Sequence, residues 1–403
     1  MNILIFTAST GGGHKRTSQA MREYFTEHLP HAKVRTVDCL KEINKMVDKT
    51  VCGSYEFMAT KIPKMYGMLY NNTQKPKMDV VPTITAMCSR SMLPCIREFL
   101  PDVIVTTHPF AGQMVSHLKG KEKIFQPIVS IMTDYAPHRA YLARYIDAYV
   151  VPSPECKQAL MQLDVPEERI FPFGIPISQT FFQPRDPLAL RKQFSLNPSL
   201  PVILIMAGSF GVTNIMEIFH DLDRSSADFQ LIIITGKNHK LFDLFQKMQG
   251  QTEKKFELVY FTNQVEAYMH ASDLLITKPG GLTISEALAC NLPMVVFDSI
   301  PGQEEDNAAF LVNRGMALRM RKGDSPSQLV ESLLGQPEKL AAMKQACQQF
   351  DTSACCSKIA DLMHRLLTQP PVPIAKKRSR KFRLARMSRR FNVAVRKTIR
   401  KKK

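Results

Sequence analysis

Residues 274–286 read LLITKPGGLTISE, and this stretch decides the fold class. Leu274 to Thr277 is a short apolar run typical of a buried strand, and Lys278 to Gly281 is a glycine-bearing turn. Thr283 to Glu286 opens a helix that we expect to run to about Cys290. A strand that passes through a short turn into a helix is the building unit of a parallel α/β sheet. The amides of such a helix N-terminus, beside flexible glycines, are suited to binding an anion.

Glu286 has two interpretations. Thr283 and Glu286 have the spacing of a capping box, in which each side chain satisfies the other's backbone amide. Glu286 could equally reach the hydroxyls of a ribose. The next expected strand, Met294 to Phe297, leads to the loop 301–307, PGQEEDN. The amide and carboxylate groups of this loop suit a polyhydroxylated ligand, although a solvated acidic loop would have the same composition.

The same alternation of short apolar runs and longer amphipathic stretches covers most of the chain. Further strands are expected at Asn2–Ala8, Val34–Val37, Val103–Thr106, Ile128–Met132, Ala148–Val151, Val202–Ala207, Leu231–Thr235 and Glu257–Tyr260. Prolines and a glycine crowd the segment 172–187, where we place a hinge. We therefore predict two doubly wound α/β domains, residues 1–175 and 187–350, which face each other across a cleft. A terminal helix over 351–368 and a basic tail over 370–403 follow them.

Two further glycine-bearing turns follow expected strands. Residues 9–14, STGGGH, follow the first strand, where close approach of backbone to a ligand is possible, and they lack the spacing of the dinucleotide fingerprint. His14 would then stand at the mouth of a ligand site, or simply be a surface histidine on a tight turn. Residues 207–211, AGSFG, occupy the equivalent place in the second half and could equally be an ordinary loop.

Three side chains at strand ends of the first half are candidates for contact with an acceptor substrate: His108, Asp134 and His138. Either histidine could instead have a structural role. Asp221 and Asp223 resemble a metal-binding DxD motif, but on a helix they would point to different faces, so no metal site is predicted. The chain has no HExxH or GxSxG motif of zinc or serine hydrolases.

The composition is that of a globular protein with a basic tail. The chain has 403 residues, 44% of them hydrophobic, and a net charge of +18. Fifteen lysines and arginines and no acidic residue lie within 376–403, so the remaining chain carries only +3. Apolar residues recur at helical spacing in this tail, at Leu384, Met387, Phe391, Val395 and Ile399. The pattern indicates a basic amphipathic helix on an anionic membrane surface. A disordered tail is the alternative, and nucleic acid is a less favoured partner.

The nine cysteines show no metal-ligand spacing and are expected to be reduced thiols. The N-terminus has no signal-peptide pattern, and no apolar run approaches the roughly 20 residues that span a bilayer. A cytoplasmic protein, peripheral on the inner face of the cell membrane, is therefore expected.

With these turns in this order, residues 1–367 resemble the glycosyltransferases that make glycosyl-diacylglycerols, the monogalactosyldiacylglycerol synthases and processive diacylglycerol glucosyltransferases. The resemblance rests on the segments 9–14, 208–211, 278–288 and 301–307. It implies a GT-B fold of two Rossmann-like domains, with a UDP-sugar donor on the C-terminal domain. It also implies inverting, metal-independent transfer of a hexose to diacylglycerol or another lipid, without a cofactor.

The matching positions imply roles for individual residues. His14 matches the histidine proposed as general base. The residues expected to bind UDP are Gly12, Gly13, Ser209, Phe261, Gly280, Gly281, Leu282, Thr283 and Glu286. Those expected at the donor hexose are Gln303, Glu304 and Asn307. Three alternatives stay open: N-acetylglucosaminyl transfer to the lipid-linked peptidoglycan precursor, a UDP-sugar epimerase, and a non-catalytic membrane- or RNA-binding module.

Overall fold

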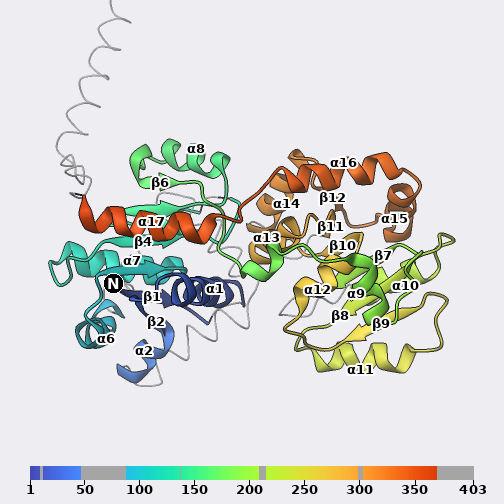
Figure 1. Ribbon diagram of the computed structural model, residues 1–403, viewed down its shortest axis with the longest axis horizontal. Helices are drawn as coiled ribbons and strands as arrows, with labels where there is room; N and C mark the ends of the chain where they lie inside the picture. The colour runs from blue at the N-terminus through green and yellow to red at the C-terminus, as the bar shows by residue number, and fades with distance from the viewer. Residues whose placement is uncertain (10–11, 47–87, 137, 208–214, 298–302, 370–403) are drawn as a thin grey trace, which may run out of the picture. The chain divides into compact units, whose positions relative to one another are not determined.

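The computed structural model describes residues 1–9, 12–46, 88–136, 138–207, 215–297 and 303–369 (Figure 1). Residues 1–370 form one compact unit, which contains every element named below. Its first half is built on a parallel six-stranded sheet in the order β2-β1-β3-β4-β5-β6. The strands are β1 (Asn2–Thr7), β2 (Lys33–Asp38), β3 (Val103–Thr106), β4 (Ile128–Ile131), β5 (Ala148–Val150) and β6 (Ile170–Phe171).

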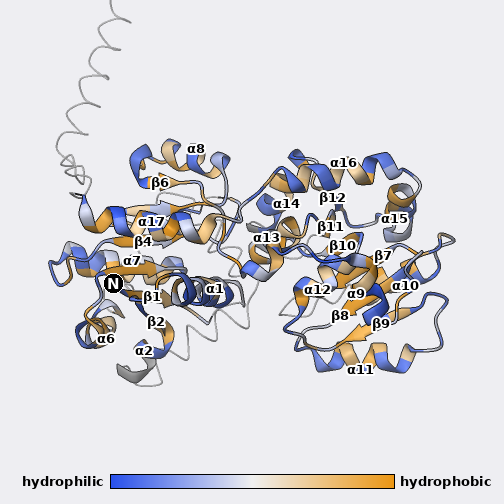
Figure 2. Cartoon of the chain, in the orientation of Figure 1, coloured by the Kyte–Doolittle hydropathy of each residue, from blue (hydrophilic) through white to orange (hydrophobic). Residues whose placement is uncertain are grey.

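Alternating side chains of this sheet enter two separate cores, as expected from the two-residue repeat of a strand. On β1, Leu4 and Phe6 are buried against one layer of helices, and Ile3 and Ile5 against another. The first layer consists of α2 (Cys39–Met46), η1 (Ser89–Met92), α6 (Leu93–Phe99), α7 (Pro109–Gly120) and α8 (Pro154–Gln162). The second consists of α1 (Gly12–His28) and α17 (Cys355–Thr368). Figure 2 shows the strands as mostly hydrophobic ribbons between helices of mixed colour.

The second half repeats the architecture with the strand order β12-β11-β10-β7-β8-β9. Its strands are β7 (Val202–Met206), β8 (Gln230–Ile234), β9 (Phe256–Val259), β10 (Leu274–Thr277), β11 (Met294–Phe297) and β12 (Ala317–Met320). One face is covered by α10 (Ile215–Asp223), α11 (His239–Met248) and α15 (Pro326–Leu334). The other is covered by α12 (Val265–Ala271), α13 (Gly281–Ala289) and α14 (Gln303–Asn313), while α16 (Pro337–Gln348) contributes to both cores.

The ten expected strands are all present, with ends within one or two residues of the prediction. Among the described residues, two strands were not predicted, β6 and β12, and both lie at the outer edges of their sheets. β6 has only two residues and directly precedes Pro172, so it shows no apolar run. β12 is interrupted by Arg319, which an edge strand tolerates because one of its sides is less buried.

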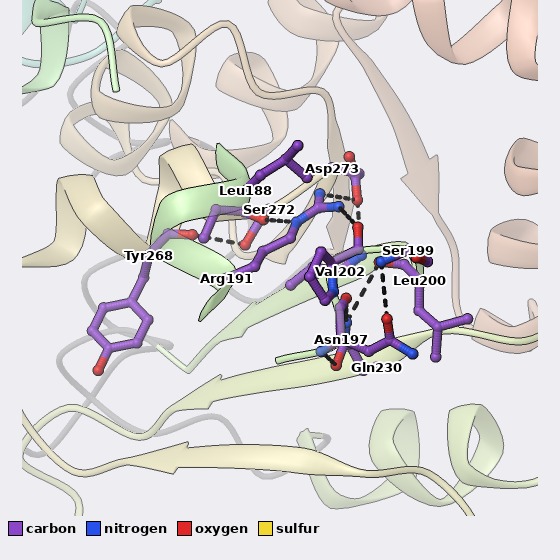
Figure 3. Close-up of polar contacts among 12 residues, drawn as sticks. Leu188, Arg191, Asn197, Ser199, Leu200, Val202, Gln230, Tyr268, Ser272 and Asp273 are labelled. Carbon is purple, nitrogen blue, oxygen red and sulfur yellow. Dashed lines mark hydrogen bonds and ion pairs between the residues drawn. The ribbon is translucent and has the colours of Figure 1, made fainter. Parts of the chain in front are cut away.

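A polar network fixes the segment between the two sheets onto the second sheet (Figure 3). This segment contains η4 (Gln179–Phe182) and α9 (Pro187–Gln193). Arg191 of α9 pairs with Asp273 at 2.7 Å, and the same carboxylate oxygen accepts a hydrogen bond from the Val202 amide. Asn197 and Gln230 exchange two further hydrogen bonds. These contacts lie where the strands begin, so they do not involve the carboxyl ends of the strands.

The helix α17 packs on the first sheet although it follows the last helix of the second half. Ile359, Leu362 and Met363 of α17 are buried with the residues of β1, β3 and β4. The chain therefore crosses between the halves twice.

Candidate functional site

Each sheet has one point where the strand order reverses, and loops diverge there to form a ligand site in doubly wound folds. In the first sheet this point lies between β1 and β3, and in the second between β7 and β10. His14 follows β1 and His108 follows β3, while the turn Lys278–Gly281 follows β10. The loop after β7 includes Ser209, which is outside the described residues. The expected turns that can be described therefore stand at these switch points.

His14 lies in the first turn of α1 and is held by groups at the ends of β3 and β4. Its Nδ1 is 2.7 Å from the Thr107 carbonyl oxygen and 3.2 Å from the Thr133 hydroxyl. A carbonyl oxygen can only accept, so Nδ1 carries the proton in the neutral imidazole and Nε2 has the free electron pair. Burial lowers the pKa of His14 to about 4, against a smaller raising effect of the Thr107 hydrogen bond. Near neutral pH, His14 is thus an unprotonated group able to accept a proton.

His108 is the nearest aromatic neighbour described for His14, in an edge-on contact with 4.6 Å between ring centroids. Its Nδ1 accepts a hydrogen bond from the Phe110 amide and thereby caps α7. This bond assigns the proton of the neutral ring to Nε2, the opposite tautomer to His14. Burial, and secondarily His14, lower the pKa of His108 well below its usual value. His108 therefore contributes a structural cap and an uncharged wall beside His14.

The other two acceptor-side candidates are also buried near the end of β4. His138 accepts a hydrogen bond from the Ala140 amide and caps the short helix η2 (Arg139–Tyr141). Asp134 is 7% exposed and follows Thr133, the residue that contacts His14. Of the predicted first-half residues, His14 and His108 are thus in contact, Asp134 follows a residue that contacts His14, and His138 has a structural role.

The helix α13 begins at Gly281, two residues earlier than expected. Its N-cap is Gly280, and no side chain caps it, so the capping box between Thr283 and Glu286 does not form. The first intrahelical bond is donated by Ile284 to Gly280, which leaves the amides of Gly281, Leu282 and Thr283 without intrahelical acceptors. The Leu282 side chain is buried in the second core, so only its backbone can face a ligand. The N-terminus of α13 therefore has the properties of an anion site.

This helix end touches the first half. A Cβ atom on Gly281 would lie 2.0 Å from the Thr133 carbonyl oxygen, so the contact requires a residue without a side chain. A Cβ atom on Gly13 would lie 3.7 Å from the Leu282 Cβ, which is an ordinary contact distance. Thr133 therefore contacts both His14 and the N-terminus of α13.

Glu286 pairs with Arg16 of α1 rather than with the helix start. Its Oε1 lies 2.7 Å from Arg16 Nη2, and the carboxyl is almost fully buried. The other oxygen, Oε2, is buried without a hydrogen-bond partner. Burial raises the pKa of Glu286 to about 7, with Arg16 acting in the opposite direction. Arg16 was not among the predicted residues, although it follows His14 by only two positions.

The expected donor-hexose residues differ in what they contact. Glu304 is buried and forms an ion pair with Lys278 at 2.9 Å. The fully buried Asn307 accepts a hydrogen bond from the Tyr135 amide and donates one to the Pro279 carbonyl oxygen. Asn307 therefore links the turn before α13 to the first half. Gln303 begins α14, and its side chain is outside the described part of the chain.

Tyr135 is a second residue that the sequence did not single out. Its ring is buried in the core of the second half and stacks on Phe310, with 4.5 Å between centroids. Its hydroxyl lies 2.9 Å from Ser285 Oγ in α13. Phe261, expected at the uracil, follows β9, is half exposed, and lies 5.0 Å from Lys237 Nζ.

No group of three or more metal-binding side chains occurs among the residues with described positions. Asp221 accepts hydrogen bonds from the Ser325 hydroxyl and the Ser327 amide, and Asp223 accepts one from the Lys254 amide. The two aspartates of the DxD sequence thus connect neighbouring segments of the chain to α10 by hydrogen bonds. Within the same described ranges, no helix has the length and apolar character required to cross a bilayer.

Comparison with known proteins places both halves in one group. Residues 14–177 match the family model of monogalactosyldiacylglycerol (MGDG) synthase, and residues 202–366 match the glycosyltransferase family 28 C-terminal domain. The chain is 29% identical over 373 residues to the processive diacylglycerol beta-glucosyltransferase of Staphylococcus carnosus, covering 90% of this chain and 93% of that protein. The Bacillus licheniformis protein of the same name is 27% identical over 357 residues, covering 87% and 91%.

Solved structures give the same architecture. MurG of Acinetobacter baumannii aligns with a TM-score of 0.60 at 14% identity, over 90% of this chain and 99% of that one. Anabaena Alr3699/HepE in complex with UDP aligns with a TM-score of 0.55 at 16% identity, over 90% and 100%. At these identities the likeness concerns the fold alone, and it confirms the expected GT-B architecture.

Proposed function

The chain belongs to the monogalactosyldiacylglycerol synthase family of family 28 glycosyltransferases, and on this premise we propose that it transfers a hexose from a UDP-sugar to diacylglycerol. The observation that carries the proposal is the position of Thr133, which contacts both His14 and the N-terminus of α13. A proton acceptor and an anion site are thereby neighbours, as a displacement at a sugar diphosphate requires. The relatives named processive diacylglycerol beta-glucosyltransferase support the same acceptor.

In the proposed reaction, the donor diphosphate lies at the N-terminus of α13. The amides of Gly281, Leu282 and Thr283 and the helix dipole stabilise the negative charge that grows on the leaving UDP. These dipoles are fixed before the reaction, so they need no metal ion to act. Lys278, in the turn before α13, lies close by and forms an ion pair with Glu304 of α14.

The acceptor hydroxyl attacks the anomeric carbon, the bond to the diphosphate breaks, and the hydroxyl proton passes to Nε2 of His14. A single displacement of this kind inverts the configuration at the anomeric carbon. The low pKa of His14 keeps Nε2 unprotonated before the donor arrives. A bound diphosphate then places negative charge nearby, which raises the affinity of the imidazole for the proton that it must accept.

Because the proposed acceptor is a lipid, the reaction would take place at a membrane surface. We propose that the basic tail, 376–403, which lies outside the described residues, attaches the protein peripherally to the anionic inner face of the cell membrane.

The test is a transfer assay with the full-length chain and diacylglycerol in anionic vesicles, with UDP-glucose, UDP-galactose and UDP-N-acetylglucosamine offered separately. We expect label in a glycosyl-diacylglycerol, unchanged by EDTA. His14→Ala should lower kcat by about 10²- to 10⁴-fold, the usual contribution of a general base, while UDP binding persists. Unchanged turnover in this variant would reject the base. UDP binding without transfer from any donor would favour the peptidoglycan precursor as acceptor or a non-catalytic role.

A further inference from the structure

The carboxyl group of Glu286 is held on one side only. Oε1 contacts Arg16 at 2.7 Å, while Oε2 is buried and lacks a hydrogen-bond partner. A buried carboxylate oxygen without a partner loses its hydration and gains nothing in return, which is costly unless a ligand supplies the missing donor. The unpaired oxygen therefore points to a ligand with a hydroxyl or amide donor at this position.

Arg16 comes from the other half of the molecule. It lies in the first turn of α1, two residues after His14, whereas Glu286 lies in α13 on the second sheet. The Arg16 side chain is 45% exposed, and its charge reaches a carboxyl that is almost inaccessible to water.

The charges around Glu286 make its ionisation depend on this contact. Burial raises the pKa of Glu286 and Glu266 of α12 raises it further, while Arg16 lowers it, with a result of about 7. Cys290, on the same helix, is itself affected by Glu286. The elements α16 and η4 also pack against α13. Without Arg16, the pKa of this carboxyl would be higher still.

We infer that Arg16 is a positioning residue of the donor site, which holds Oε1 of Glu286 so that Oε2 accepts a hydrogen bond from a ribose hydroxyl of the UDP-sugar. The inference rests on the proposed function for the identity of the donor. A carboxylate that accepts from a hydroxyl binds it more strongly than a neutral carboxyl group does. Because Arg16 and His14 share one turn of α1, binding of the ribose also favours the arrangement that brings His14 to the reacting sugar.

The experiment measures the affinity of the full-length protein for UDP-glucose by calorimetry between pH 6 and 9. UDP-glucose is preferred to UDP because its phosphates lack the terminal ionisation near pH 6 that would obscure the result. The variants are Arg16→Met, Arg16→Lys, Glu286→Gln and the double variant Arg16→Met/Glu286→Gln. Arg22→Met is the matched control, because Arg22 is an exposed residue further along the same helix.

For the wild type, we expect affinity to decrease as the pH falls through about 7, where Glu286 takes up a proton. Arg16→Met should move this midpoint to higher pH and weaken binding at pH 7, by roughly tenfold for each unit of the shift. Arg16→Lys should have a midpoint close to that of the wild type. Glu286→Gln should remove the pH dependence of binding. Arg16→Met should have little effect when it is added to Glu286→Gln.

An unchanged midpoint in Arg16→Met, or tighter binding at all pH values, would overturn the inference and leave the proposed function intact. Failure of the wild-type protein to bind either UDP-glucose or UDP-galactose would overturn both. If Arg16→Met does not fold, Arg16→Gln, which removes the charge but keeps a polar side chain, decides: a midpoint at higher pH supports the role, and an unshifted midpoint rejects it.

Discussion

The partly buried imidazole of His14 predicts how stability depends on pH. Its pKa is about 4 in the folded protein, against an ordinary value near 6.5. Between these values the unfolded chain binds more protons than the folded one, so stability rises with pH and is lost as the pH falls from 6.5 toward 4. From pH 7.5 to 5.0 this amounts to about 2 kcal/mol for one such histidine.

We therefore expect the fall in Tm between pH 7.5 and 5.0 to be smaller for His14→Ala than for the wild type. Thermal unfolding followed by circular dichroism measures it, with His220→Ala, an exposed histidine of α10, as the control. An identical fall in wild type and His14→Ala would show that His14 is protonated in the folded protein.

The positions of candidate site residues were predictable to the extent that these residues follow strands in the sequence. His14, Gly281 and Glu286 could be identified because turns after β1 and β10 reach the ligand edge of any doubly wound sheet. Arg16 and Tyr135 could not, because their contacts join segments more than a hundred residues apart. Such contacts depend on how the two sheets pack, which no local pattern records.

At the level of helices, the geometry at the start of α13 predicts that alanine substitutions at two adjacent glycines differ strongly in their effect on activity. A methyl group on Gly281 would collide with the Thr133 carbonyl oxygen at 2.0 Å, whereas one on Gly280 meets no atom within 4 Å. Gly281→Ala must therefore displace the helix end from Thr133 and His14. Because a misplacement of about 1 Å costs on the order of 10²-fold in rate, we expect kcat to fall by about that factor, with a much smaller loss for Gly280→Ala.

Steady-state transfer assays on both variants, with Tm as a check on folding, make this comparison. Equal losses in the two would indicate that the contact with Thr133 has no role in catalysis.

The strands were predictable because a strand buried on both faces is apolar along its whole length, as Leu274 to Thr277 is. The start of α13 was not, because glycines at 280 and 281 carry no helical signal and the capping-box spacing suggested a later start. In the structure the helix begins at Gly281 with no side-chain cap, so its first amides are free of side chains, as the proposed anion site requires.

For the molecule as a whole, Tyr135 connects the two halves. Its hydroxyl and Ser285 Oγ are 2.9 Å apart and buried. Tyr135→Phe should cost about 1 to 2 kcal/mol in stability by leaving Ser285 with one partner fewer. The double variant with Ser285→Ala should cost less than the sum of the single changes, because the two groups satisfy each other. Chemical unfolding of the four proteins measures this coupling, and strictly additive effects would contradict it.

The net charge of +18 predicts how the whole chain meets a membrane. Removing the chain after Pro373 takes away fifteen positive charges, so binding to anionic vesicles should weaken, and most strongly at low salt, where surface attraction is least screened.

A second variant keeps every charge but replaces Leu384, Phe391 and Ile399 by Ser. If the tail binds as an amphipathic helix, this variant should also lose affinity, and the loss should persist at high salt because buried apolar area is not screened. Vesicle sedimentation at two salt concentrations separates the contribution of charge from the contribution of buried apolar area. Binding that depends on charge alone would show that the tail attaches only by electrostatic attraction. Binding equal to wild type after truncation would locate the membrane contact in residues 1–373.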